Sequence, residues 1–121
     1  KRVIFDSARF VENAYFIKTR EDGYADKTIK EIVKEMFSLA DGMTMSSKKD
    51  GLVNMGGFIA TRHEDWYEGA KKFCIPFEGY LTYGGMNGRD MRLWPLVLRK
   101  IPSLIISKHV SNRFNILRRV G

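Results

Sequence analysis

Strand-like and helix-like segments alternate along the first ninety residues, and this order restricts the chain to few folds. Residues 2–6 and 43–46 are short apolar runs typical of strands, and two segments of helical periodicity, 8–20 and 26–40, lie between them. Three consecutive apolar residues before Asp6 suit a strand covered on both faces. The alternation therefore predicts an α/β fold rather than separate β and α layers.

The second helical segment has the clearest pattern. We expect Asp26 to cap its start and Asp41-Gly42 to end it. Lysines and glutamates alternate on one face, which is typical of a solvated surface. The opposite face is an apolar stripe of Ile29, Ile32, Val33, Met36, Phe37 and Ala40.

The following residues continue the alternation. Residues 52–60 suit a strand and 64–72 a helix. Residues 73–77 are strand-like, with Pro76 as a limit, and 78–85 form an irregular, glycine-rich loop. Lys48 and Lys49 then lie at the connection between two strands.

Composition narrows the functional classes. A chain of 121 residues forms at most one domain, and no apolar run is long enough to cross a bilayer. Cys74 is the only cysteine, so we expect a reducing compartment, the cytoplasm. His63 and His109 lie far apart without a partner cysteine, so the sequence does not resemble a zinc site.

The net charge of +7 lies entirely in the last thirty residues. Residues 1–91 carry fourteen basic and fourteen acidic residues, whereas 92–121 carry seven basic residues and no acid. This distribution argues against a nucleic-acid-binding or membrane-binding function for the main segment.

The basic tail, 92–121, leaves three alternatives open. Pro95, Pro102 and the β-branched residues make it a poor candidate for a helix. One hypothesis is a shifted reading frame, because Trp94-Pro95 read one base earlier can encode Met-Ala, which suits a helix. The others are a genuine basic tail and a segment that binds membrane or nucleic acid, which has few aromatics for stacking.

Adjacent lysines between small hydroxyl residues and Asp50-Gly51 have a structural and a chemical interpretation. A lysine pair is most often a solvated turn. A desolvated lysine, however, loses its proton readily and attacks carbonyl groups. The neighbouring motifs decide between the two interpretations.

Several motifs in a fixed order resemble the tryptophanase and tyrosine phenol-lyase family, the β-eliminating lyases that use pyridoxal phosphate. The likeness covers residues 5–91, roughly three quarters of the chain, and stops where the charge balance changes. The matching runs are Phe5-Asp6-Ser7-Ala8-Arg9, residues 12–18, Ser46-Ser47-Lys48-Lys49-Asp50, residues 53–58 and Tyr83–Met91. The resemblance implies that residues 1–91 are part of the cofactor-binding large domain of a fold-type-I (aspartate aminotransferase-like) enzyme.

The resemblance also implies roles by position. Lys49 corresponds to the lysine that forms the Schiff base with the cofactor and then acts as general base. Asp6 corresponds to the carboxylate that pairs with the pyridine nitrogen, and Arg9 to the group beside the phenolic oxygen. Ser46 matches a phosphate contact, with Lys48 in the same neighbourhood. Asn54 matches a backbone-carbonyl ligand of the activating potassium ion.

The chemistry needs these residue types. Cleavage of a bond at Cβ requires a stabilised carbanion at Cα, which the cofactor provides strongly only while its ring nitrogen is protonated. A carboxylate beside that nitrogen favours the charged form. Taken alone, Asp6 is more often a strand-end cap and Arg9 a surface helix residue, and only their combination with Lys49 in the family order favours the catalytic interpretation.

The implied activity is β-elimination of L-tryptophan to indole, pyruvate and ammonia. Residues 6–10 and 78–87 look more like tryptophanase, and tyrosine phenol-lyase is the alternative. Family members are homotetramers, with active sites that use residues of two subunits. The segment lacks the phosphate-cradling loop and the small domain, so we expect it to be inactive in isolation. The competing class is a non-catalytic basic binding module.

Overall fold

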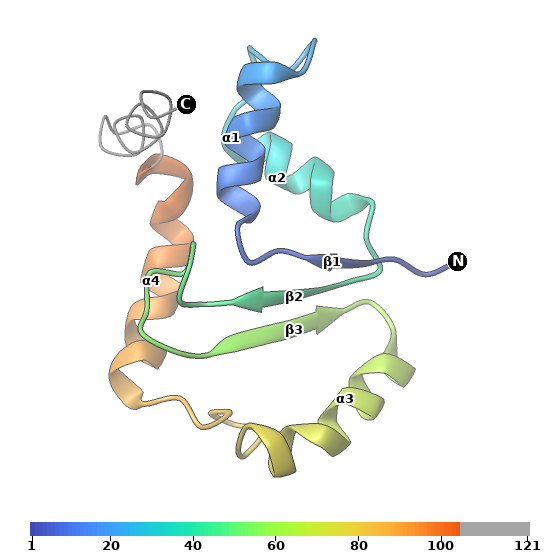
Figure 1. Ribbon diagram of the computed structural model, residues 1–121, viewed down its shortest axis with the longest axis vertical. Helices are drawn as coiled ribbons and strands as arrows, with labels where there is room; N and C mark the ends of the chain where they lie inside the picture. The colour runs from blue at the N-terminus through green and yellow to red at the C-terminus, as the bar shows by residue number, and fades with distance from the viewer. Residues whose placement is uncertain (105–121) are drawn as a thin grey trace, which may run out of the picture.

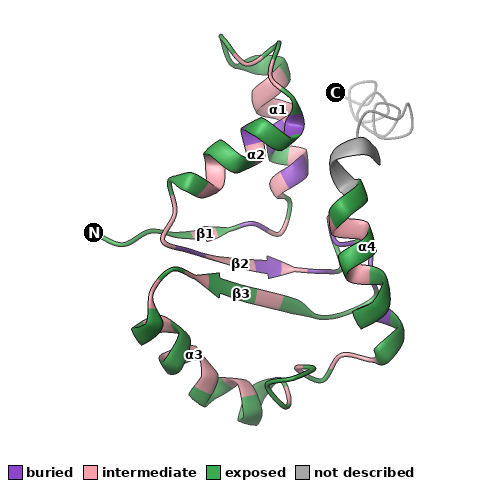
Figure 2. Ribbon diagram, turned by 180° about the vertical axis from the view of Figure 1, so that it is seen from behind, coloured by how far each residue is buried: buried purple, intermediate pink, exposed green. Residues whose placement is uncertain are grey.

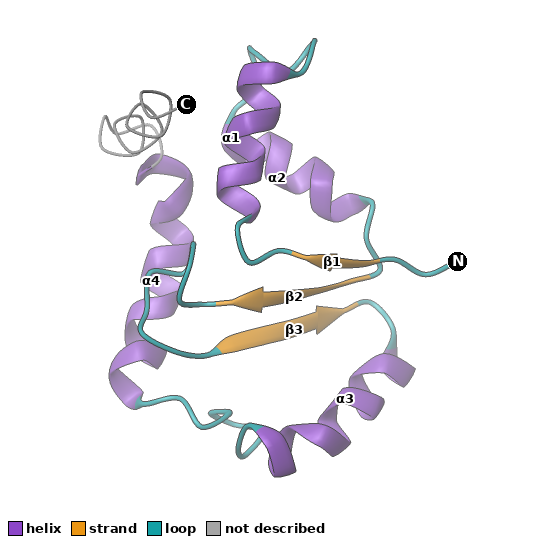
Figure 3. Cartoon of the chain, viewed as in Figure 1, coloured by secondary structure: helices purple, strands orange, loops and turns teal. Residues whose placement is uncertain are grey.

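The computed structural model describes residues 1–104 and shows one three-stranded sheet with four helices (Figures 1 and 3). The sheet order is β1-β2-β3, with β1 parallel to β2 and β2 antiparallel to β3. The expected α/β class is confirmed in this coarse sense. The elements are β1 (Ile4–Asp6), α1 (Phe10–Arg20), α2 (Ile29–Ser38), β2 (Gly42–Ser46), β3 (Gly57–Thr61), α3 (Glu64–Phe77) and α4 (Gly88–Leu104).

The connection from β1 to β2 places two candidate segments at one edge of the sheet. Parallel neighbours need a crossover, and here α1 and α2 provide it. Asp6, the last residue of β1, pairs with Thr44 in β2. Because the carboxyl ends of parallel strands meet at the same edge, Asp6 lies beside the end of β2 from which the lysine pair follows.

The packed core lies between the two crossover helices. Val11 and Ala14 of α1 contact Ile29 and Ile32 of α2, and none of the four is more than 5% exposed. Figure 2 shows this buried cluster where α1 and α2 meet. Partly buried side chains from α1, α2 and α4 surround it, and those from α4 are Val97 and Leu98. The apolar stripe predicted for the second helix is therefore largely the face that packs.

The second helix begins at a different residue from the one predicted. Its N-cap is Thr28, not Asp26, and its last residue is Ser38. The Thr28 hydroxyl accepts from the amide of Glu31, while the Glu31 carboxylate accepts from the amide of Thr28 at 2.7 Å. This reciprocal capping box satisfies two amides that a helix start leaves unpaired, which explains the later start.

Thr28→Ala should loosen the start of α2 without affecting the sheet. Loss of an N-cap costs about 1 kcal/mol, equivalent to roughly fivefold faster amide exchange in the first turn. Hydrogen exchange followed by mass spectrometry of peptides covering residues 29–32 measures this change. Thr19→Ala is the matched control, since Thr19 only bonds back to carbonyls of its own helix. Equal exchange in both variants would contradict the capping role.

Two predicted strands differ from the structure. Strand β1 is shorter than residues 2–6, and it is not covered on both faces, because Ile4 is 60% exposed. Successive side chains of a strand point to opposite faces, and only the Phe5 side is covered, where its ring lies 5.5 Å from that of Phe37 in α2. Residues 52–56 form an irregular loop rather than a strand, because positive φ angles at Leu52 (53°) and Gly56 (97°) interrupt an extended chain.

Two helices extend through segments that the sequence did not predict as helical. Residues 73–77 are the last turn of α3, not a strand, although Pro76 lies there. Residues 92–104 belong to α4 despite Pro95. A proline inside a helix costs about 3 kcal/mol, and packing outweighs it in α4. Trp94 lies 4.8 Å from Phe58 between ring centroids, and the next turn packs on the core.

The rest of the basic tail, residues 105–121, lies outside the described part of the chain. The alternatives for the tail as a whole, including the shifted reading frame, therefore stay predictions. Within residues 1–104, no helix combines the length and apolarity that a membrane span requires.

Candidate active site

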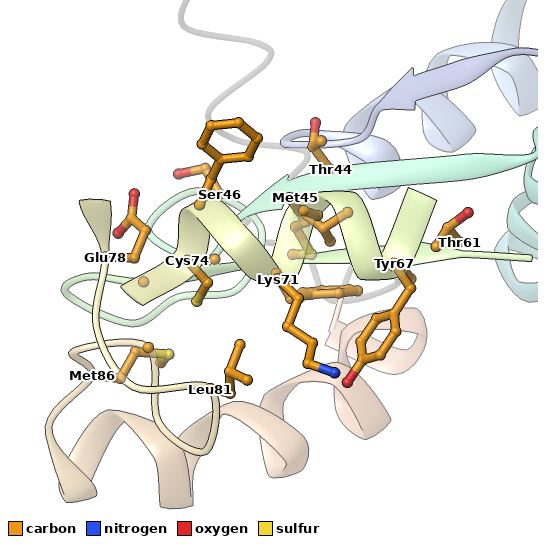
Figure 4. A pocket seen from close by; sticks show the side chains of 18 of the residues that line it. Thr44, Met45, Ser46, Thr61, Tyr67, Lys71, Cys74, Glu78, Leu81 and Met86 are labelled. Atoms are coloured by element: carbon orange, nitrogen blue, oxygen red, sulfur yellow. The ribbon is translucent and has the colours of Figure 1, made fainter. Parts of the chain in front are cut away.

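A broad groove of about 1560 Å³ opens between β2, β3, α3 and the start of α4. Figure 4 shows side chains of its lining: Thr44, Met45 and Ser46 from β2, Tyr67, Lys71 and Cys74 from α3, and Leu81 and Met86 from the following loop. Compact ligand pockets usually measure 300–1,000 Å³. The groove is larger than such a pocket, and the described residues enclose it on some sides only.

Three of the six predicted site residues line this groove: Asp6, Ser46 and Lys49. Asp6 ends β1, Ser46 ends β2, and Lys49 follows in the next turn. Within the described part of the chain, the Asp6 carboxylate accepts only a 3.3 Å bond from the amide of Ala8. Among residues 1–104, no side chain bonds to the Lys49 amine. The structure therefore brings an uncommitted amine, a carboxylate and a hydroxyl to one groove.

The other three predicted residues do not line the groove. Arg9 is the N-cap residue of α1, and its guanidinium pairs with Glu12 at 3.0 Å. The Glu12 hydrogen bond and charge raise the pKa of Arg9. Lys48 and Asn54 are exposed on the turns that follow β2. No contact within residues 1–104 tests the predicted roles of these three residues, which therefore stay predictions.

Residues 47–56, here called the lysine loop, are closed by backbone hydrogen bonds. The amide of Ser47 donates to Gly56 at 2.9 Å, and the amide of Val53 donates back to Ser47 at 3.3 Å. The amide of Leu52 donates to Lys49 at 3.1 Å. These bonds hold the turn that carries Lys49 in a defined shape at the end of β2.

Two glycines allow the lysine loop to be this tight. A Cβ at Gly51 would clash with the backbone of Ser47. A Cβ at Gly56, whose φ is already +97°, would meet the Met86 sulfur at 2.5 Å. Glycine is the residue that tolerates such close approach and positive φ. The close approach of neighbouring atoms therefore explains why glycine occupies both positions.

Two polar residues of the lysine loop were not singled out by the sequence. Ser47 is fully buried, and its Oγ has no hydrogen-bond partner in the described chain. Asp50 accepts a 2.8 Å bond from the amide of Val11 in α1. Burial raises the pKa of the Asp50 carboxyl, and bonds from the amides of Val11 and Glu12 oppose that shift. The only signal in the sequence was their place beside the lysine pair.

The other basic groups along the groove, Arg62, His63 and Lys71, already have partners. Lys71 pairs with Glu68 at 2.8 Å, and this bond raises the pKa of Lys71. His63 contacts Asp41 at 2.9 Å, and the bond from His63 lowers the pKa of Asp41. Asp41 also accepts from the amide of Val3, so it ties the residue before β1 to the N-cap of α3. Within residues 1–104, Lys49 is therefore the basic group of the groove without a partner.

The chain is similar to known lyases over nearly its whole length. A family model described as "Beta-eliminating lyase" matches residues 1–120, so the match continues past the boundary inferred at residue 91. A "Probable beta-eliminating lyase" of Trichomonas vaginalis is 78% identical over 91 residues, which are 75% of this chain and 20% of that protein.

Two further relatives carry more specific names. A "Tyrosine phenol-lyase" of Lacrimispora saccharolytica is 51% identical over 120 residues, 99% of this chain and 25% of that protein. A "Tryptophanase" of Salinibacter ruber is 54% identical over 99 residues, 82% of this chain and 21% of that protein. The chain spans about a fifth to a quarter of the length of these curated relatives.

Proposed function

The chain belongs to the beta-eliminating lyase family, and from this we propose that the complete protein cleaves an aromatic L-amino acid by pyridoxal-phosphate-dependent β-elimination. The observation that carries the proposal is the groove that Asp6, Ser46 and Lys49 line together. In this proposal residues 1–91 are a piece of the cofactor-binding large domain.

The residues present fit pyridoxal phosphate in three respects. Lys49 offers a primary amine for the cofactor's aldehyde, and its ammonium is free of ion pairs within residues 1–104. Asp6 offers a carboxylate for the ring nitrogen, and Ser46 offers a hydroxyl for the phosphate. The open sides of the groove leave room for the remaining walls of a pocket, which other parts of the protein would supply.

Each residue has a definable task. Pyridoxal phosphate, when bound, withdraws electrons from Cα of the substrate and so eases loss of its proton. The negative charge of Asp6 would keep a proton on the ring nitrogen. The Lys49 amine would take the Cα proton of the substrate as a general base. The tight lysine loop would hold that amine within reach.

The substrate is proposed as tryptophan or tyrosine. The sequence motifs favour tryptophan, whereas relatives named tyrosine phenol-lyase and tryptophanase support both equally. Tryptophan would release indole and tyrosine would release phenol, so identifying the aromatic product distinguishes the two reactions.

The complete protein should release indole from L-tryptophan or phenol from L-tyrosine, together with pyruvate. The experiment follows pyruvate by a coupled assay and identifies the aromatic product by chromatography, with each amino acid in turn. L-Alanine, which has no leaving group at Cβ, is the matched control. Absence of pyruvate from both aromatic substrates in protein loaded with pyridoxal phosphate would reject the proposal.

Three further features belong to the same proposal. Potassium would bind through the backbone carbonyl of Asn54, the complete protein would be a homotetramer, and it would reside in the cytoplasm. Asn54 is exposed on the lysine loop, so a potassium ion at its carbonyl would be accessible to further ligands from another segment or subunit. Activity that is equal in potassium and sodium buffers would argue against the cation site.

A further inference from the structure

The first turn of α1 lacks a cap from its own sequence. Arg9 at the N-cap makes no side-chain capping bond. The first amides of a helix have no intrahelical partner, and one left unpaired in a buried position is costly. Val11, whose amide is one of these, is only 1% exposed.

Asp50 provides the missing cap from a distant part of the chain. Its carboxylate accepts from the Val11 amide at 2.8 Å across a separation of 39 residues. The backbone adds a second, longer link, from the amide of Asp50 to the carbonyl of Ala8 at 3.5 Å. A carboxylate at the start of a helix is also favoured by the helix dipole.

This bond joins the two segments that carry the candidate catalytic groups. Asp50 directly follows Lys49, and α1 begins only four residues after Asp6. The lysine loop is itself closed by the bonds of Ser47 and cannot hold a side chain at Gly51. A restraint at Asp50 is therefore transmitted to the backbone of Lys49.

We propose that Asp50 is a positioning residue, which fixes the Lys49 amine relative to Asp6 by fastening the lysine loop to the first turn of α1. The inference rests on the proposed function, because it assigns a task within the same site. Asp50 is not assigned a proton-transfer role, since its carboxylate faces backbone amides of α1. Asp50 is also absent from the lining of the groove.

The test compares three substitutions of Asp50 in the complete protein. Asp50→Ala removes the acceptor and should raise the dissociation constant of pyridoxal phosphate about tenfold, as loss of an orienting partner commonly does in metal sites. Asp50→Asn keeps an acceptor oxygen at the same reach and should bind within about twofold of the parent. Asp50→Glu, one methylene longer, displaces the loop and should fall between them.

Hydrogen exchange provides a readout that does not depend on activity. Peptides covering residues 10–13 and 47–56 should exchange faster in Asp50→Ala than in the parent, while those in β2 should not change. In Asp50→Asn both regions should match the parent. This rescue by a neutral residue separates the hydrogen bond from the negative charge.

Thr28→Ala is the matched control, since it removes a helix cap from α2 and Thr28 does not line the groove. Its cofactor affinity should equal that of the parent. Parent affinity in Asp50→Ala would overturn the inference, as would an Asp50→Asn protein as weak as Asp50→Ala. If Asp50→Ala does not fold, parent affinity in Asp50→Glu would overturn it instead. Failure of the proposed function would be visible separately, as a parent protein in which borohydride fixes no cofactor on Lys49.

Discussion

Lys49→Ala is expected to abolish covalent attachment of pyridoxal phosphate to the complete protein and to reduce β-elimination at least about 10³-fold. Two tasks are lost together, the amine that holds the cofactor and the base that takes the Cα proton, and a positioned base alone contributes about 10²–10⁴-fold. Borohydride reduction followed by peptide mass spectrometry measures the attachment. Pyruvate release measures the rate.

The neighbouring lysine provides the comparison that makes this result specific. Both lysines are exposed, but Lys49 lines the groove and Lys48 does not. Lys48→Ala should therefore keep the borohydride-fixed cofactor on residue 49. Fixation on Lys48 in the parent, or persistence of fixation in Lys49→Ala at the level of the parent, would contradict the assignment.

Local patterns predicted the elements whose partners lie close in sequence. The apolar stripe of the second helix correctly identified Ile29 and Ile32 as core, because a helix face repeats over three and four residues and packs against the preceding helix. The strands leading to Asp6 and Ser46 were predicted from short apolar runs, although their paired residues lie 38 positions apart. Their meeting at one edge follows from the parallel pairing that a helical crossover imposes.

The predictions for other elements were wrong because packing or backbone dihedral angles outweighed the secondary-structure propensity of the residues. Aromatic and β-branched residues near Pro76 favour a strand by propensity, yet α3 continues to Phe77, where the rings of Phe73 and Phe77 lie 6.3 Å apart between centroids. Within the lysine loop, the positive φ at Leu52 ends an apparently continuous strand pattern. The contact between the Trp94 and Phe58 rings and the packing of α4 on the core join distant segments, so local periodicity could not predict them.

The site was predictable only as residue types and not as contacts. Asp6, Ser46 and Lys49 came from motifs, and the structure adds that they share a groove. Asp50 could not be recognised, because its partner amide is 39 residues away and a backbone donor has no signature in the sequence. The cofactor contact of Arg9 stays a prediction from its motif, and the structure adds only that its guanidinium pairs with Glu12 at 3.0 Å.

Asp6→Asn should lower kcat/KM for the aromatic substrate about 10²–10³-fold, the usual scale for loss of one fixed electrostatic group, while leaving the fold intact. Asparagine keeps the size of the side chain and an oxygen that can accept from Ala8. It loses the negative charge that would favour a protonated ring nitrogen, and each pKa unit lost there is equivalent to 1.36 kcal/mol. Steady-state kinetics and the absorbance of the bound cofactor measure both effects.

The appropriate control changes a carboxylate of equal size away from the groove. Asp22 is exposed between α1 and α2 and does not line the groove, so Asp22→Asn should match the parent. Borohydride fixation on Lys49 should persist in Asp6→Asn, because the amine and its loop are unchanged. Parent kcat/KM in a variant that still carries the cofactor on Lys49 would show that Asp6 does not act on the ring. A variant that loses the cofactor altogether would assign Asp6 to binding rather than to activation of the ring.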